Sequence, residues 1–79
     1  MVRNDGAEAR RERMEKISRN LNQMFDRGEK PILSTTVCEI IYSTGLSETK
    51  VHEYLKILEK LGKITLDFRA DRILNPKRV

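Results

Sequence analysis

The sequence predicts a mainly α-helical domain with three helices, the first the longest, followed by a small β-hairpin. Three observations lead to this fold class. Apolar side chains recur at helical spacing in three stretches of the chain. Glycine or serine stands where each of these stretches ends or begins. Near the C-terminal end, residues 63–68 alternate polar and apolar side chains, which is typical of a strand with one buried face.

The first helix is expected over residues 7–27, with Gly28 as its left-handed cap. Its apolar side chains form one stripe: Met14, Ile17, Leu21 and Met24. Such a stripe usually packs on its own domain, but its spacing is also that of a coiled coil. We expect the stripe to join two copies of the chain in a homodimer.

Two shorter helices are expected in the middle of the chain. After an extended segment at residues 31–33, Thr36 and Glu39 have the spacing of a capping box, so the second helix is predicted to begin at Thr36. Gly45 ends it, and Ser47 is a good N-cap for the third helix. The inner side of the third helix is predicted to be apolar: Val51, Tyr54, Leu55, Leu58 and Leu61.

The remaining residues predict the hairpin. Gly62 ends the third helix, and residues 63–68 form the first strand, with residues 69–72 as a polar turn. Ile73 and Leu74 form the return strand.

Length and composition limit the organisation and the class of protein. Seventy-nine residues hold one domain, at residues 7–75, between a frayed start at 1–6 and a basic tail at 76–79. The net charge of +4 lies at the two ends of the chain and favours a polyanionic partner. No apolar run is long enough to span a membrane, and one cysteine, Cys38, can neither form an internal disulfide nor hold zinc. We therefore expect a cytoplasmic protein without metal or cofactor, in which Cys38 is packed beside the core.

The order helix, turn, helix, hairpin resembles the winged helix-turn-helix family. The resemblance covers residues 14–75 and is strongest between Val37 and Ile64. There Thr44-Gly45-Leu46-Ser47 makes the turn, and Leu58-Glu59-Lys60-Leu61-Gly62-Lys63-Ile64 leads from the third helix into the hairpin. In size and charge the chain is similar to small regulators of archaea and of their viruses and plasmids. The resemblance implies a transcriptional regulator that binds double-stranded DNA, with the third helix in the major groove and the hairpin as a wing on the backbone.

The outward side of the third helix supplies the candidate DNA contacts. They are Ser47, Glu48, Thr49, Lys50, His52, Glu53 and Lys56. Lysines reach guanine edges or phosphates, and a glutamate accepts a hydrogen bond from a cytosine amino group. On the wing, Arg69 and Arg72 are predicted to flank the tip and to contact phosphates or the minor groove.

Other readings of the same residues stay open. Glu48 and Glu53 repel phosphates, so they fit either a selective reader or a winged helix that docks a protein within a larger assembly. An RNA-binding role lacks an exposed aromatic platform. His52 next to Glu53 does not make a zinc protease motif, because the chain has no second histidine. Without a nucleophile and base pair, neither enzymatic activity nor a small-molecule substrate is expected.

Overall fold

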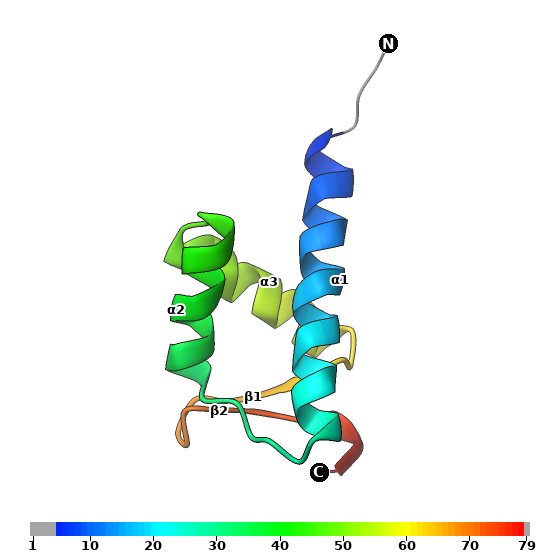
Figure 1. Cartoon of the computed structure of the whole chain (residues 1–79), viewed down its shortest axis with the longest axis vertical. Coiled ribbons are helices and arrows are strands. Elements are labelled where there is room, and N and C mark those ends of the chain that lie inside the picture. The colour runs from blue at the N-terminus through cyan, green and yellow to red at the C-terminus, as the bar shows by residue number, and fades with distance from the viewer. Residues whose placement is uncertain (1–4, 79) are drawn as a thin grey trace.

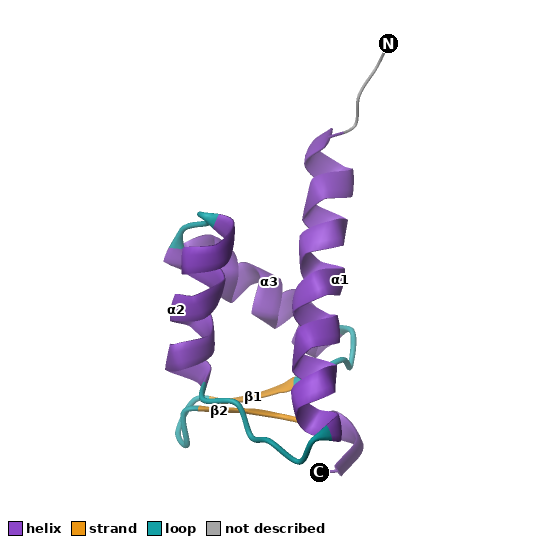
Figure 2. Ribbon diagram, viewed as in Figure 1, coloured by secondary structure: helices purple, strands orange, loops and turns teal. Residues whose placement is uncertain are grey.

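The three predicted helices and the hairpin are present in a computed structural model of the protein, which describes residues 5–78. The elements are α1 (Asp5–Asp26), α2 (Leu33–Thr44), α3 (Glu48–Lys60), β1 (Thr65–Asp67), β2 (Arg72–Leu74) and a final 3-10 turn (Pro76–Arg78). Their order confirms a mainly helical winged helix-turn-helix fold with a long first helix (Figures 1 and 2).

The elements surround α3. Helices α1 and α2 stand on opposite sides of the molecule, α3 crosses behind them, and the hairpin closes the lower end (Figure 1). The strands β1 and β2 are antiparallel, with Leu66 opposite Ile73. Ile32, just before α2, forms an isolated antiparallel bridge with Arg72. The return strand therefore pairs on both sides, and the hairpin is joined to the segment that leads into α2.

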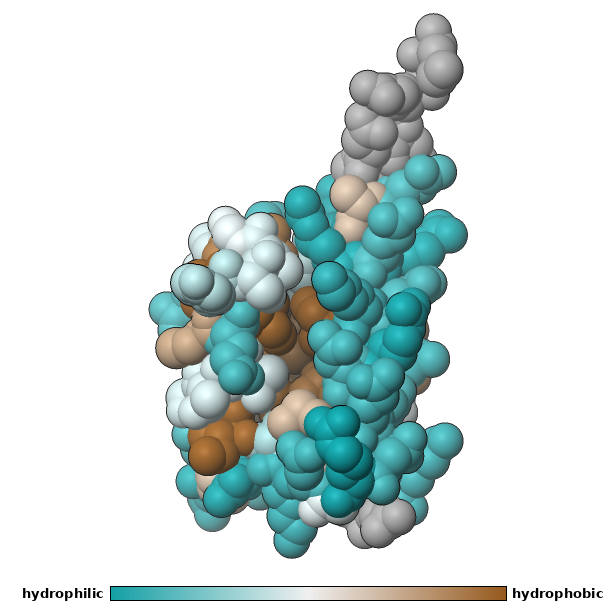
Figure 3. All heavy atoms as spheres, viewed as in Figure 1, coloured by the Kyte–Doolittle hydropathy of each residue, from teal (hydrophilic) through white to brown (hydrophobic). Residues whose placement is uncertain are grey.

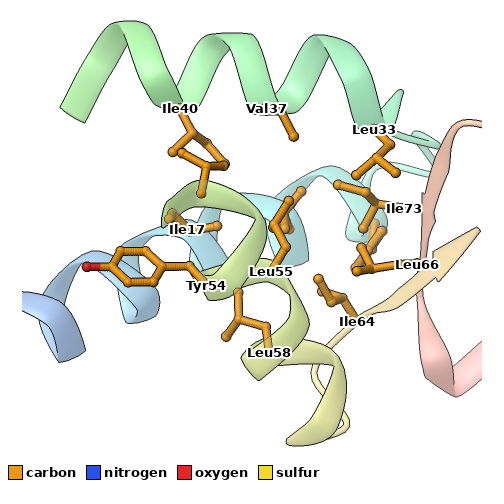
Figure 4. Close-up of a cluster of buried hydrophobic side chains, with 13 residues drawn as sticks. Ile17, Leu33, Val37, Ile40, Tyr54, Leu55, Leu58, Ile64, Leu66 and Ile73 are labelled. Atoms are coloured by element: carbon orange, nitrogen blue, oxygen red, sulfur yellow. The ribbon is translucent and has the colours of Figure 1, made fainter. Parts of the chain in front are cut away.

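Side chains from every helix and both strands form one hydrophobic core (Figure 4). Val51 and Leu55 of α3 and Ile73 of β2 have no exposed surface. Burying a side chain of this size contributes about 1.5–3 kcal/mol. Tyr54 is also buried, as predicted. Because the inner side of α3 lies at the centre of this core, its outward side is held in a fixed direction.

The start of α2 differs from the prediction. The helix begins at Leu33, three residues before the predicted Thr36, whose side chain is buried in the core. The N-cap residue Ile32 makes no side-chain cap hydrogen bond. Asp71, in the turn of the hairpin, accepts hydrogen bonds from the first amides of the helix instead. Because the capping residue lies so far along the chain, the sequence around Leu33 does not indicate that the helix begins there.

The predicted stops are confirmed. Gly45 ends α2 with φ 75°, and its N–H donates to the carbonyl of Ile41. A side chain at this φ would be strained, so glycine suits the turn between the two helices. Gly28 and Gly62 also have positive φ.

Two apolar side chains are more exposed than their spacing predicted. Leu61 was expected on the buried side of α3, but the helix ends at Lys60 and Leu61 is 63% exposed. Phe68 was expected to follow Ile64 and Leu66 into the core. The strand ends at Asp67, so Phe68 leaves the alternation and is 59% exposed in the turn.

The two predicted chain ends are only partly covered by the structure. Residues 1–4 of the predicted frayed start lie outside the described residues, and Asp5 and Gly6 already belong to α1. The predicted tail begins as a 3-10 turn, in which the Lys77 amide donates to the Asn75 side chain over 3.1 Å. In the part of the chain that the structure describes, no helix is both long and apolar enough to cross a membrane.

Candidate nucleic-acid interface

The start of α3 is built by a local cap. Ser47 has extended backbone angles, and its hydroxyl accepts a hydrogen bond from the Lys50 amide over 3.2 Å. This confirms the predicted N-cap. The amides of Glu48 and Thr49 belong to the first turn, where no intrahelical carbonyl is available to them. They point out of the positive end of the helix, where an anion is stabilised.

The polar side of α3 carries two close pairs of a basic and an acidic side chain. Lys50 Nζ lies 3.6 Å from Glu53 Oε1, and His52 Nε2 lies 3.8 Å from Glu48 Oε2. The side chains of Lys50, Glu53 and Glu48 are more than half exposed, and that of His52 is 37% exposed. Such pairs contribute only about 0.2–0.5 kcal/mol, so a stronger partner can replace them. Glu48 and Glu53, the two carboxylates that would repel phosphates, thus each have a basic neighbour on the same helix.

The remaining candidates on α3 are exposed: Ser47, Thr49 and Lys56. All seven predicted residues therefore lie on or at the start of one helix, and only His52 is partly buried. The helix is also tied to the hairpin, because Glu59 Oε2 accepts a hydrogen bond from the Leu66 amide over 2.9 Å. No sequence pattern indicated this role for Glu59, since the contact depends on how β1 folds back against α3.

The two wing arginines occupy different environments, and they do not both flank the tip. Arg69 lies in the turn and is exposed. Arg72 lies in β2, is half-buried, and donates from Nη1 to the carbonyl of Lys30 over 3.0 Å. Its guanidinium therefore supports the segment before α2. The exposure of Phe68, next to Arg69, was not predicted, because the alternation of polar and apolar residues at 63–68 placed its side chain in the core.

The apolar stripe of α1 belongs mainly to the core of a single copy. Ile17 and Leu21 are buried against the other elements, which corrects the prediction that they face a second copy. Met14 and Met24 are partly buried against the same core. The physical reason is that a domain with so few apolar residues needs this face of its longest helix to complete its interior.

Other exposed apolar groups lie outside the stripe. Leu61 and, at 39% exposure, Ile57 lie at the C-terminal end of α3. Leu61 also lines a shallow groove between α1 and α3, together with Leu58 and with Met14 of the stripe. Tyr42 of α2 is 92% exposed. These residues give the surface several places where a protein partner could pack.

A second groove, of about 520 Å³, separates α1 from α2. Apolar side chains, coloured brown, are visible in the hollow between the two helices in Figure 3. Ile17, Leu21 and Ile40 line this groove, together with charged groups such as Arg13 and Glu39.

Cys38 is exposed on α2, which corrects the predicted packing beside the core. The inner side of this helix is occupied by Leu33, Thr36, Val37 and Ile40, so Cys38 turns outward. Among the described residues, no group of three His, Cys, Asp or Glu side chains is arranged to hold a metal ion.

A comparison with protein families finds a similarity in the helix-turn-helix. Residues 33–65 match the family described as bacterial regulatory protein, arsR family. The matched segment runs through α2 and α3 to the first residue of β1, which is the part that carries the exposed polar helix. Among curated proteins and solved structures there is no significant match. Residues 33–65 are therefore similar to the helix-turn-helix of ArsR-family regulatory proteins, and with the hairpin that follows they form a winged helix-turn-helix fold.

Proposed function

We propose that the protein regulates transcription by selective binding of double-stranded DNA, with α3 in the major groove and the hairpin turn on the phosphate backbone. The observation that carries this proposal is the division of α3 into two sides. Val51 and Leu55 are wholly buried on one side, and the polar candidates are exposed on the other. A helix held in this way can enter the groove without losing contacts to its own domain.

The side chains suggest distinct roles along the helix. Ser47 and the first amides of α3 suit a phosphate. Thr49 suits a thymine methyl group, and Lys56 suits a guanine edge or a phosphate. Glu53 suits a cytosine amino group, in place of its present neighbour Lys50.

The charge balance favours selective over general DNA binding. Glu48 and Glu53 place two carboxylates on the polar side of α3, which weakens attraction to any phosphate backbone. A carboxylate at a base edge then strengthens binding at the matching base pair and weakens binding at other base pairs. Discrimination of about 1–3 kcal/mol per good contact follows from this arrangement.

Selection of binding sites from a random duplex pool tests the role of Glu53. The wild-type protein is compared with Glu53→Gln, which keeps the size and removes the charge. Glu39→Gln is the matched control, because Glu39 is an exposed glutamate of α2 outside the proposed contacts. We expect one enriched motif for the wild type and the control, and a less selective motif with higher non-specific affinity for Glu53→Gln. An identical motif for all three proteins would remove Glu53 from the set of base contacts.

The exposed carboxylates and apolar groups also favour a second candidate, a winged helix that docks a protein. Tyr42 and Leu61 are the most exposed large apolar side chains among the described residues. A gel-shift titration on random duplex DNA at low and moderate salt separates the candidates. Binding that falls steeply with salt supports the DNA-binding proposal. A protein that stays unbound at both salt concentrations would support the docking function.

We also propose that the regulator acts as a homodimer, which would let two copies of α3 read two half-sites. Because Ile17 and Leu21 are buried, we assign the contact to Met14, a partly accessible residue of the stripe that lines a groove with Leu61, together with Leu61 and Ile57. Leu61→Glu should give a folded monomer in sedimentation, whereas Tyr42→Ser, which removes an even more exposed side chain outside the proposed contact, should stay dimeric. A wild-type monomer at tens of micromolar would refute this proposal.

A further inference from the structure

The turn of the hairpin supplies the hydrogen-bond acceptors for the first amides of α2. The carbonyl of Asp71 accepts a hydrogen bond from the Leu33 amide over 2.9 Å. Its carboxylate accepts two more from Ser34, over 2.9 Å from the amide and 2.6 Å from the hydroxyl. Figure 1 shows the turn directly beneath the first turn of α2. One residue of the wing therefore satisfies the first donors of the helix-turn-helix.

Asp71 has an unusual backbone for this role. Its φ of 56° makes it the one residue other than glycine with a positive φ among those described. Aspartate and asparagine adopt this conformation more easily than other side chains, but it still costs energy. The cap on α2 is a contact that offsets this cost.

We propose that Asp71 is a positioning residue for DNA binding: its contact with Ser34 sets the orientation of the wing relative to the helix-turn-helix. Arg69, two residues before Asp71 in the same turn, would then reach the backbone while α3 is in the groove. This inference rests on the proposed function, because it concerns how the proposed wing contact is made.

The dimensions of the wing explain why it needs such a contact. Each strand has three residues, and a two-stranded hairpin of this size is not stable by itself. Its base is held by the Glu59 bond to β1 and by the Ile73 amide, which donates to the carbonyl of Pro31 over 2.9 Å. The turn that carries Arg69 is joined to the helices through Asp71. Without the carboxylate bonds, binding would have to order the turn and would lose affinity.

Two substitutions separate positioning from charge. Asp71→Gly tolerates the positive φ and keeps the backbone carbonyl, but it removes both carboxylate bonds. Asp71→Asn also tolerates this φ, and its amide oxygen and nitrogen can still bond the amide and hydroxyl of Ser34. Both variants remove one negative charge beside the proposed DNA contact. If charge alone mattered, the two variants would bind DNA with equal affinity, and both would bind more tightly than the wild type.

In the test, Arg69→Ala is introduced into the wild type, into Asp71→Asn and into Asp71→Gly. Affinity for a random-sequence duplex is measured over a range of salt concentrations, and circular dichroism checks the fold. In the wild type and in Asp71→Asn, we expect Arg69→Ala to weaken binding about 3-fold or more and to flatten the salt slope by about one unit. In Asp71→Gly, which should bind more weakly than Asp71→Asn, we expect Arg69→Ala to change affinity less than about 1.5-fold.

Equal affinities of Asp71→Gly and Asp71→Asn, or an equal effect of Arg69→Ala in both, would overturn the positioning role and leave the DNA-binding proposal intact. Absence of salt-dependent binding by the wild type would overturn the proposed function and this inference with it. If Asp71→Gly fails to fold, Ser34→Ala takes its place, because it breaks the hydroxyl bond from the α2 side and leaves the wing sequence unchanged. A smaller effect of Arg69→Ala in that background would again support the inference, and an undiminished effect would overturn it.

Discussion

Replacing each wing arginine by alanine should affect two different properties of the protein. Arg69 is exposed in the hairpin turn, so Arg69→Ala should weaken DNA binding at low salt and leave stability unchanged. Arg72 is half-buried and donates to the Lys30 carbonyl, so Arg72→Ala should lower stability and leave the salt dependence of binding unchanged. The two residues therefore provide matched controls for each other.

The size of each expected effect follows from the loss of one contact: a phosphate contact for Arg69 and a hydrogen bond for Arg72. A phosphate contact contributes about 0.9 to the slope of log affinity against log salt, so its loss changes the affinity ratio of wild type to variant about 3.5-fold when salt rises fourfold. A hydrogen bond contributes about 0.5–1.5 kcal/mol to stability. In a domain of this size, 1 kcal/mol corresponds to about 4–8 °C in Tm. Arg72→Ala should therefore lower Tm by several degrees.

Fluorescence anisotropy with a labelled random duplex at several salt concentrations gives the slopes, and thermal unfolding followed by circular dichroism gives Tm. Equal slopes for the wild type and Arg69→Ala would refute the assignment of Arg69 to the DNA backbone. A slope reduced by Arg72→Ala, with Tm unchanged, would show that the bond to Lys30 is not the main role of Arg72.

Three further experiments test the fold. Leu55→Ala, at a wholly buried site, should cost about 2–5 kcal/mol in urea unfolding, and a cost below 1 kcal/mol would contradict the central place of α3. Gly45→Ala should cost about 1–2 kcal/mol from backbone strain alone, since no atom beyond the adjacent residues lies within 4 Å of the added methyl group, and Gly45→Asn should cost less. Cys38 should react with a thiol reagent as fast in the native protein as in urea, and slow native labelling would contradict its exposure.

The features that the sequence predicted depend on neighbouring residues. Helical spacing predicted the buried side of α3 through Val51 and Leu55, because the period of the helix alone decides which side chains share a side. Gly45 and Ser47 predicted the turn and the new helix, because positive φ and N-capping are properties of one residue and its next few neighbours. The exposed polar candidates on α3 follow from the same periodicity.

The predictions that failed concern contacts between distant segments. The start of α2 was placed three residues late, because its cap comes from Asp71, 37 residues beyond Ser34. Arg72 was assigned to the wing tip, whereas in the fold it reaches Lys30, 42 residues before it. Spacing along the chain carries no information about such pairs.

The sequence by itself determined which helices form, where most of them end, and which side of α3 is polar, because these depend on local spacing and on single capping residues. Only the tertiary structure decided where α2 begins, which arginine stays free on the wing, and whether the stripe on α1 is core or surface. Ile17 and Leu21 would suit either a coiled coil or an interior equally well. They are buried because α2, α3 and the hairpin are too small to complete a core without them, and that deficit becomes visible only when all the elements pack together.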